Sequence, residues 1–162
     1  MIDYNNTDDA ETEVLIDVSG SVNEHLVKSF LRQLKNLLTA TKLKVGFFAD
    51  GVTPNDKFIN IIKEKDIDNI SITRLGSGTN FDVAVREFSN NQSINKIIFT
   101  DGWPGKMPTE DTKRINVIWL VYENKNFAPC CGKVINVQPK KIIDTQTKAV
   151  TQQNININEN TR

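Results

Sequence analysis

Side chains with hard oxygen donors follow three apolar runs in this sequence. They are Asp17, Ser19 and Ser21 after the first run, Thr79 after the second, and Asp101 after the third. The set contains two carboxylates and three hydroxyls, and it lacks imidazole and thiolate. Such donors favour a hard divalent cation, Mg²⁺ first with Mn²⁺ or Ca²⁺ as substitutes, and suit zinc poorly. With so few charged ligands, water would complete the coordination shell, and at least one position would stay open to a carboxylate from elsewhere.

The pattern of apolar residues predicts the elements that must position these side chains. We expect strands at residues 13–17, 43–49, 70–75, 94–100, 115–122 and 133–137, an amphipathic helix over 23–41, and a second helix beginning just after Thr79 or Asn80. The segment around Phe58 and Ile59 is ambiguous between a short helix and a strand remnant, and 109–114 could form a short helix.

Strands that alternate with helices define the expected fold class. We predict an α/β domain, namely an open, mostly parallel six-stranded sheet with helices on both faces, of the Rossmann-like kind. Ligands of such sheets bind at the carboxyl ends of the strands. The three polar loops therefore meet at one edge, although they lie far apart in the sequence.

Composition limits the domain organisation and the compartment. We expect a flexible leader at 1–11, one domain at 12–140, and a polar, disordered tail at 141–162, for which a terminal edge strand is the less favoured alternative. The first residues do not resemble a secretory signal, and no apolar run approaches the roughly 20 residues that span a bilayer. These features predict a cytoplasmic monomer without a membrane segment. The adjacent Cys130 and Cys131 have no metal-ligand spacing and are expected to be buried or half-buried thiols, with a redox role as the less favoured alternative.

The chain carries no net charge. Its 20 Lys and Arg residues balance 20 Asp and Glu residues, so no overall field attracts nucleic acid or an anionic membrane. A local basic patch stays possible, but Lys140-Lys141 is too short to support nucleic-acid binding.

The three motifs together resemble the metal-ion-dependent adhesion site of von Willebrand factor A (VWA) domains. Asp-x-Ser-x-Ser after the first strand, Gly-Thr at a helix start and Thr-Asp-Gly after a later strand match that site over residues 13–137. The resemblance implies that Asp17, Ser19, Ser21, Thr79 and Asp101 hold the ion. It further implies that an Asp or Glu of another protein completes the coordination.

A closer likeness is to bacterial VWA-like domains that follow a metallopeptidase-like region. The shared features are Thr-Asp-Gly before a Pro-containing loop and an apolar strand with Trp119. Members of that group commonly work beside MoxR-type AAA ATPases, so the resemblance implies a partner of that kind. The chain departs from the pattern in having Asn80 where an Asp often follows the Thr. It also lacks a His-Glu-x-x-His segment, so no peptidase activity is implied.

The leading hypothesis is a Mg²⁺-dependent interaction module that is not an enzyme. Asn80, Trp103 and Lys106 would then form a rim that selects the partner. The enzyme alternative is a haloacid-dehalogenase-like phosphohydrolase, which would want an acidic residue where Ser19 stands. An RNA-binding VWA-like module is the third alternative.

Each residue also has a simpler structural interpretation. Ser21 could cap the first helix and Thr79 or Asn80 the second. Asp101-Gly102 could be an ordinary turn, and Trp103 could pack beneath its loop. His25, the only histidine, is expected to be a solvated surface residue.

Overall fold

A computed structural model describes residues 11–88, 95–103, 116–129 and 132–138. These residues form a six-stranded sheet with the strand order β3-β2-β1-β4-β5-β6. The strands are β1 (Glu11–Asp17), β2 (Lys42–Phe48), β3 (Ile59–Ile61), β4 (Asn95–Thr100), β5 (Val117–Val121) and β6 (Lys133–Asn136). The helices are α1 (Glu24–Leu38), the 3₁₀ helix η2 (Asn55–Lys57), α2 (Glu64–Asp68) and α3 (Phe81–Glu87).

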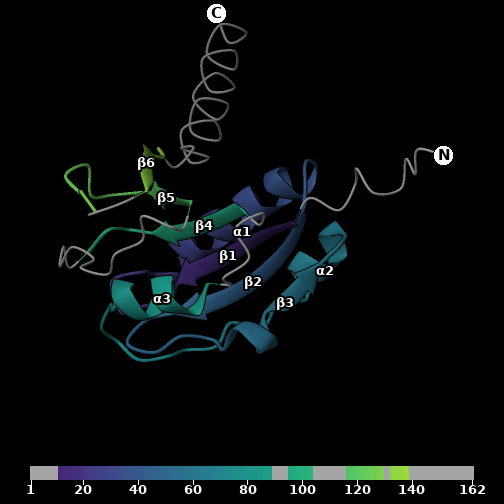
Figure 1. Cartoon of the computed structure of the whole chain (residues 1–162), viewed down its shortest axis with the longest axis horizontal. Coiled ribbons are helices and arrows are strands. Elements are labelled where there is room, and N and C mark those ends of the chain that lie inside the picture. Colours follow the sequence, from purple (N-terminus) through teal and green to yellow (C-terminus); the bar gives the residue numbers. More distant parts are fainter. Residues whose placement is uncertain (1–10, 89–94, 104–115, 130–131, 139–162) are drawn as a thin grey trace, which may run out of the picture.

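The sheet is parallel except at one edge. β1 lies between β2 and β4 and pairs with both in parallel, β5 and β6 continue the parallel order, and β3 is antiparallel to β2. The predicted fold class, an α/β sheet that is mostly parallel and has helices on both faces, is therefore confirmed. Figure 1 shows α1 behind the sheet and α3 in front of it.

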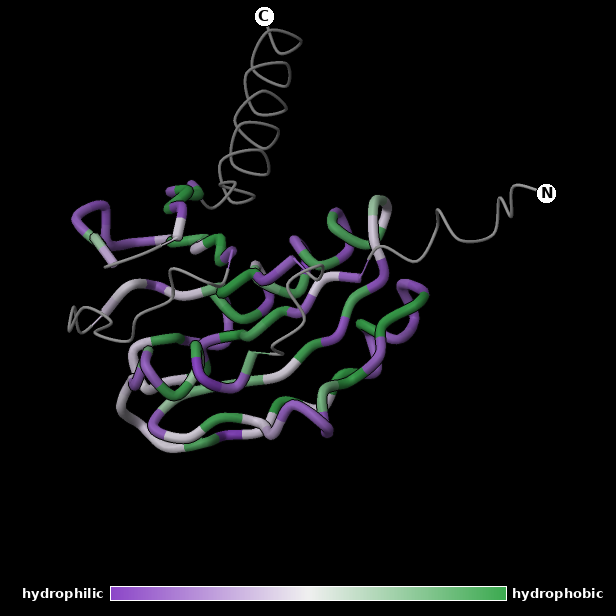
Figure 2. The backbone as a smooth tube through the Cα atoms, viewed as in Figure 1, coloured by the Kyte–Doolittle hydropathy of each residue, from purple (hydrophilic) through white to green (hydrophobic). Residues whose placement is uncertain are grey.

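Two apolar cores lie on opposite faces of the sheet. α1 buries Leu26, Val27, Phe30 and Leu34 against one face, and α3 buries Phe81, Ala84 and Val85 against the other. Successive residues of a strand point to opposite faces, so β1 contributes Val14 and Ile16 to the first core and Leu15 to the second. The apolar (green) residues of Figure 2 accordingly follow the central strands. Because both faces of β1 are buried, polar side chains can reach solvent only beyond the ends of this strand.

The helix starts are fixed by asparagines. Asn23 caps α1, where its Oδ1 accepts a hydrogen bond from Leu26 N at 2.8 Å. Asn80 caps α3 in the same way, with Oδ1 accepting from Val83 N at 3.3 Å. The second of these caps was predicted. Ser21, the predicted cap of the first helix, does not cap it, which leaves its hydroxyl for other contacts.

The predicted strand at 70–75 is wrong. The side of β2 away from β1 pairs with β3 instead, which returns antiparallel directly after the short η2 helix. Residues 70–75 belong to no strand, and Ile70 and Leu75 pack against the α1-side core, whereas Ile72 is 37% exposed. The alternating apolar pattern of this segment therefore corresponds neither to strand pairing nor to one buried face. For the ambiguous segment around Phe58 and Ile59, the strand alternative is correct, because β3 begins at Ile59.

Some predictions need correction at their boundaries or lie outside the described residues. β1 begins at Glu11, so the last residue assigned to the leader belongs to the sheet. Residues 1–10, Lys106, the short helix at 109–114, Cys130 and Cys131, and the tail at 141–162 lie outside the described residues. Among the helices of the described part, none has the length and apolar character to cross a membrane.

Candidate functional site

Asp17 is fully buried at the carboxyl end of the central strand β1. One carboxylate oxygen, Oδ1, accepts a hydrogen bond from Ser19 N at 2.9 Å. The other, Oδ2, accepts from the hydroxyl of Thr100 on the neighbouring strand β4, at 2.6 Å. The register pairs Ile16 with Phe99, which sets Asp17 beside Thr100. The two strand ends are therefore joined at the predicted site.

Asp101 follows directly on β4 and is also fully buried. Its Oδ1 accepts a hydrogen bond from Trp103 N at 2.9 Å, whereas its Oδ2 is buried and has no hydrogen-bond partner within the described part of the chain. A buried carboxylate oxygen without a partner is costly, because water no longer solvates it. A feature of this kind calls for a compensating group.

The pKa of Asp17 reflects its burial and its neighbours. It is raised to about 6, chiefly by burial and to a smaller extent by the negative charge of Asp101, while the hydrogen bonds from Ser19 and Thr100 lower it. Neither carboxylate has an ion pair with a basic side chain of the described segments. The sheet edge thus holds buried negative charge that nothing in the described residues neutralises.

Backbone and side-chain hydrogen bonds join the three predicted loops. Gly20 N donates to Ser77 O at 2.8 Å, which ties the first loop to the second. The Thr79 hydroxyl donates to Trp103 O at 3.2 Å, which ties the second loop to the third. The meeting of the loops at one sheet edge, expected from the topology, is therefore confirmed.

The hydroxyls of the first loop lie next to each other. Ser19 Oγ is 3.4 Å from Ser21 Oγ, and Ser19 is fully buried whereas Ser21 is exposed. The serine hydroxyls and the Thr79 hydroxyl each keep lone pairs that could accept or ligate. The loop therefore offers neutral oxygen donors that run from the buried carboxylates toward solvent.

Three residues that support the loops were not predicted. Asn124, after β5, donates from Nδ2 to Gly102 O at 3.0 Å. Asp50, after β2, accepts from Gly78 N at 2.9 Å, and Arg74 donates from Nη1 to Val18 O at 3.2 Å. The position of Asn124 and Asp50 directly after strands could have indicated such a role. No sequence pattern could have indicated the contact of Arg74.

Glycines at two points let these supports approach. Gly76 has φ of +113°, and a Cβ there would overlap the carboxylate of Asp50. Gly102 has φ of +81°, and its Cβ would press on the Asn124 side chain. Residues other than glycine rarely adopt these angles, so the second and third loops depend on these glycines.

The predicted rim is described in part. Trp103 is 45% exposed, although its backbone N–H and C=O are both bonded within the site. The side chain of Trp103 therefore does not pack beneath its loop, which was the alternative interpretation. Asn80 is exposed, and its side-chain oxygen is used as the helix cap.

The predicted donor set has the chemistry that a hard cation prefers. Within the described ranges, no group of three or more His, Cys, Asp and Glu side chains could hold a metal ion. The predicted set is of another kind, since it contains two carboxylates with three hydroxyls. The unpaired Asp101 Oδ2 and the uncompensated charge beside it are the features that a divalent ion would satisfy.

An open, mostly parallel sheet with helices on both faces and a polar cluster at the carboxyl ends of β1 and β4 defines a Rossmann-like α/β domain with a strand-end site. Residues 13–138 match the family described as VWA-like domain (DUF2201), and the chain belongs to that family. No curated protein matches the sequence.

Solved structures share the fold at low sequence identity. The conserved hypothetical protein BatB from Bacteroides thetaiotaomicron is 14% identical with a TM-score of 0.55, over 93% of this chain and 99% of that chain. Proximal thread matrix protein 1 from the mussel byssus is 18% identical with a TM-score of 0.56, over 87% of this chain and 46% of that chain. An aerotolerance-related membrane protein from Bacteroides fragilis is 16% identical with a TM-score of 0.50, over 69% of this chain and 67% of that chain. These similarities concern the fold.

Proposed function

We propose that this domain is a Mg²⁺-dependent interaction module that binds an acidic side chain of another protein. Asp17, Ser19, Ser21, Thr79 and Asp101 would hold the ion, and Mn²⁺ or Ca²⁺ would substitute for it. The single observation that carries the proposal is the buried Asp101 Oδ2, which has no partner in the described part of the chain and lies in the field of a second buried carboxylate.

The chemistry of the site favours binding over catalysis. A bound divalent ion would supply positive charge for the two aspartates and an open position for a carboxylate from a partner. Both oxygens of Asp17 accept hydrogen bonds, and the residue is fully buried, so it is poorly presented as a nucleophile. Its role in this proposal is to fix the first loop and to help hold the ion.

The exposed side chains at the edge would give selectivity. The indole of Trp103 stands beside the site on a backbone that Asp101 and Thr79 fix. Rigid aromatic groups of this kind often anchor partners at interfaces. We include Asn80 and Lys106 in the proposed rim from their sequence positions. A MoxR-type AAA ATPase system in the cytoplasm is the partner class that the sequence resemblance suggests.

A labelled peptide with one aspartate, compared with its asparagine counterpart, tests the proposal. Fluorescence anisotropy should show binding of the aspartate peptide in Mg²⁺, loss of that binding in EDTA, and at least about tenfold weaker binding of the asparagine peptide. Trp103→Ala should weaken peptide binding and leave the affinity for Mn²⁺ unchanged. Equal binding of the two peptides, or binding that ignores EDTA, would refute the proposal.

A further inference from the structure

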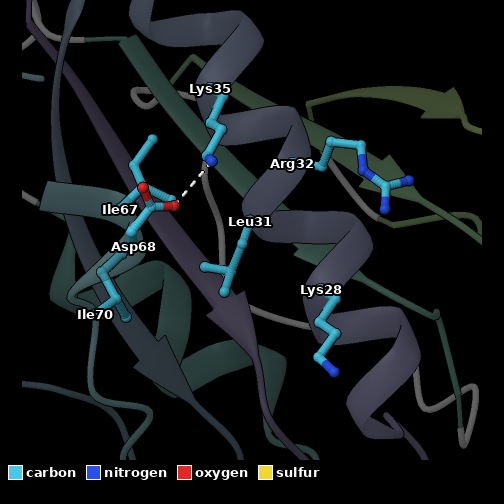
Figure 3. A pocket seen from close by; sticks show the side chains of 7 residues that line it. All are labelled: Lys28, Leu31, Arg32, Lys35, Ile67, Asp68 and Ile70. Carbon is cyan, nitrogen blue, oxygen red and sulfur yellow. Dashed lines mark ion pairs between the residues drawn. The ribbon is translucent and has the colours of Figure 1, made fainter. Parts of the chain in front are cut away.

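A groove between α1 and α2 lies apart from the strand-end site. It encloses about 450 Å³, a size typical of binding pockets. Leu31 of α1 and Ile67 and Ile70 of the α2 side supply its apolar part. In Figure 3, Leu31 and Ile70 project into the space between the two helices. The bottom of the groove is therefore suited to an apolar side chain.

Basic side chains stand around this apolar surface. Lys28, Arg32 and Lys35 of α1 line the groove against one carboxylate, that of Asp68. Lys28 and Lys35 are on the same side of α1 as Leu31, because residues three, four and seven apart share a helix face. In Figure 3, Arg32 projects from the side of α1 that faces away from α2, so it lies at the border of the groove. The groove thus has an apolar centre and an excess of positive charge.

The ion pairs already present leave these cations available. Lys35 Nζ lies 2.8 Å from Asp68 Oδ1, with side-chain exposures of 37% and 59%, and Lys28 Nζ lies 3.2 Å from Glu24 Oε1 with both side chains more exposed still. Exposed pairs of this kind contribute little to stability, because water and salt screen them. A carboxylate from a ligand can therefore replace Asp68 or Glu24 at small cost.

We propose that this groove binds an acidic segment of another protein, in which an apolar side chain lies between two carboxylates. Lys28 and Lys35 are seven residues apart, which is about 10 Å along a helix. Two acidic residues four positions apart in an extended strand share one face with the residue midway between them, and they lie about 13 Å apart, which the long lysine side chains can reach. The apolar side chain between them would enter the space lined by Leu31, Ile67 and Ile70. This site does not use the metal, so it is independent of the proposed function.

The test uses a labelled peptide with a leucine midway between two glutamates that are four positions apart, added to the full chain in EDTA at low salt. EDTA keeps the strand-end site out of the measurement. We expect binding that weakens with added salt and disappears when serine replaces the leucine. Lys28→Gln and Lys35→Gln should each weaken binding about two- to fivefold, whereas Asp68→Asn should strengthen it by a similar factor because a competing carboxylate is gone.

Lys57→Gln is the matched control, since Lys57 is exposed in η2 and is not part of the groove. Circular dichroism should show that all variants fold. The proposal is overturned if the peptide does not bind, if Lys57→Gln weakens binding as much as Lys28→Gln and Lys35→Gln do, or if binding requires Mg²⁺. It is equally overturned if a single-stranded oligonucleotide of the same charge binds to the groove as tightly, because the apolar contact would then be irrelevant.

Discussion

Thr100 donates its hydroxyl proton to Asp17 Oδ2 at 2.6 Å, inside the protein, across two strands that are 83 residues apart in the sequence. The same Thr100 oxygen accepts a hydrogen bond from Gly102 N at 2.9 Å. One hydroxyl therefore fixes both the buried carboxylate of the first loop and the backbone of the third. The order of the candidate site depends on this contact.

Thr100→Val should destabilise the protein by about 1–3 kcal/mol, because it leaves Asp17 Oδ2 and Gly102 N without their partner in a buried place. The pKa of Asp17 should rise, since the hydrogen bond from Thr100 lowers it. Urea unfolding at neutral pH measures the change. Thr39→Val, which alters an exposed hydroxyl at the end of α1, is the control and should cost clearly less. Equal losses in the two variants would contradict the assigned role.

The contribution of Asp17 to the stability of the metal-free protein should fall as the pH rises from about 4 to about 6. The pKa of Asp17 is raised from 3.8 to about 6 by burial, so between these values the folded state binds more protons than the unfolded state. The favourable contribution is complete below the unfolded pKa and is lost as the pH rises through the folded pKa. Asp17→Asn should remove this dependence and relieve a cost of up to about 3 kcal/mol at pH 7 in the metal-free protein, less what is lost because the amide NH₂ cannot accept the bond from Thr100. An equal dependence of stability on pH in the native protein and in Asp17→Asn over this window would contradict this account.

Affinity for Mn²⁺ should depend on pH in the opposite sense. A protonated carboxyl group is a poor ligand, so affinity should decline below about pH 6, the pKa of Asp17, by up to about tenfold per pH unit. Mn²⁺ binding followed by electron paramagnetic resonance between pH 5 and 8 tests this expectation. Affinity that is constant over this range would mean that Asp17 does not ligate the ion.

Gly76→Ala should disrupt the second loop. The new Cβ would overlap Asp50 at a φ of +113°, and strain of this kind costs about 1–3 kcal/mol. Gly51→Ala is a matched control, because a Cβ there meets only ordinary contacts. Thermal unfolding should show the difference, and Mn²⁺ affinity should fall in Gly76→Ala alone. Similar behaviour of the two variants would show that the loop tolerates the change.

Asn124→Ala should displace the third loop. The variant removes the bond from Nδ2 to Gly102 O and the acceptor for Asn126 N, with an expected loss of about 1–2 kcal/mol. Asn126→Ala removes an exposed side chain next to it and should have little effect. Mn²⁺ binding should weaken in the first variant and not in the second. Retention of full affinity by Asn124→Ala would show that Asp101 is held by other contacts.

Much of the fold was accessible from the sequence because the buried strands are continuous apolar runs. Val14, Leu15 and Ile16 face alternate sides, and both sides are covered, so the pattern is unambiguous. The segment at 70–75 misled because Ile70 and Leu75 pack on the core while the residues between them are mostly exposed. Ile72, which completes the alternating pattern, is 37% exposed, so alternation over so short a segment did not reflect a buried strand face.

Of the residues in the candidate site, only those in the three motifs could be predicted from the sequence. The meeting of Asp17, Thr79 and Asp101 followed from the position of their loops after strands. The supports did not follow, because Arg74 reaches Val18 O and Asp50 reaches Gly78 N through contacts that depend on loop conformation. Ser21 was predicted as a possible cap because its residue type suits one, yet Asn23 two residues later starts the helix.

Calorimetric titration of Mg²⁺ into the metal-free protein, beside the variants Asp101→Asn and Asn126→Ala, tests the central claim most directly. The account predicts one site in the native protein, at least about tenfold weaker binding in Asp101→Asn, and unchanged binding in Asn126→Ala. An absence of binding in the native protein, or equal binding in all three proteins, would contradict the claim that the buried carboxylates at the sheet edge hold a divalent cation.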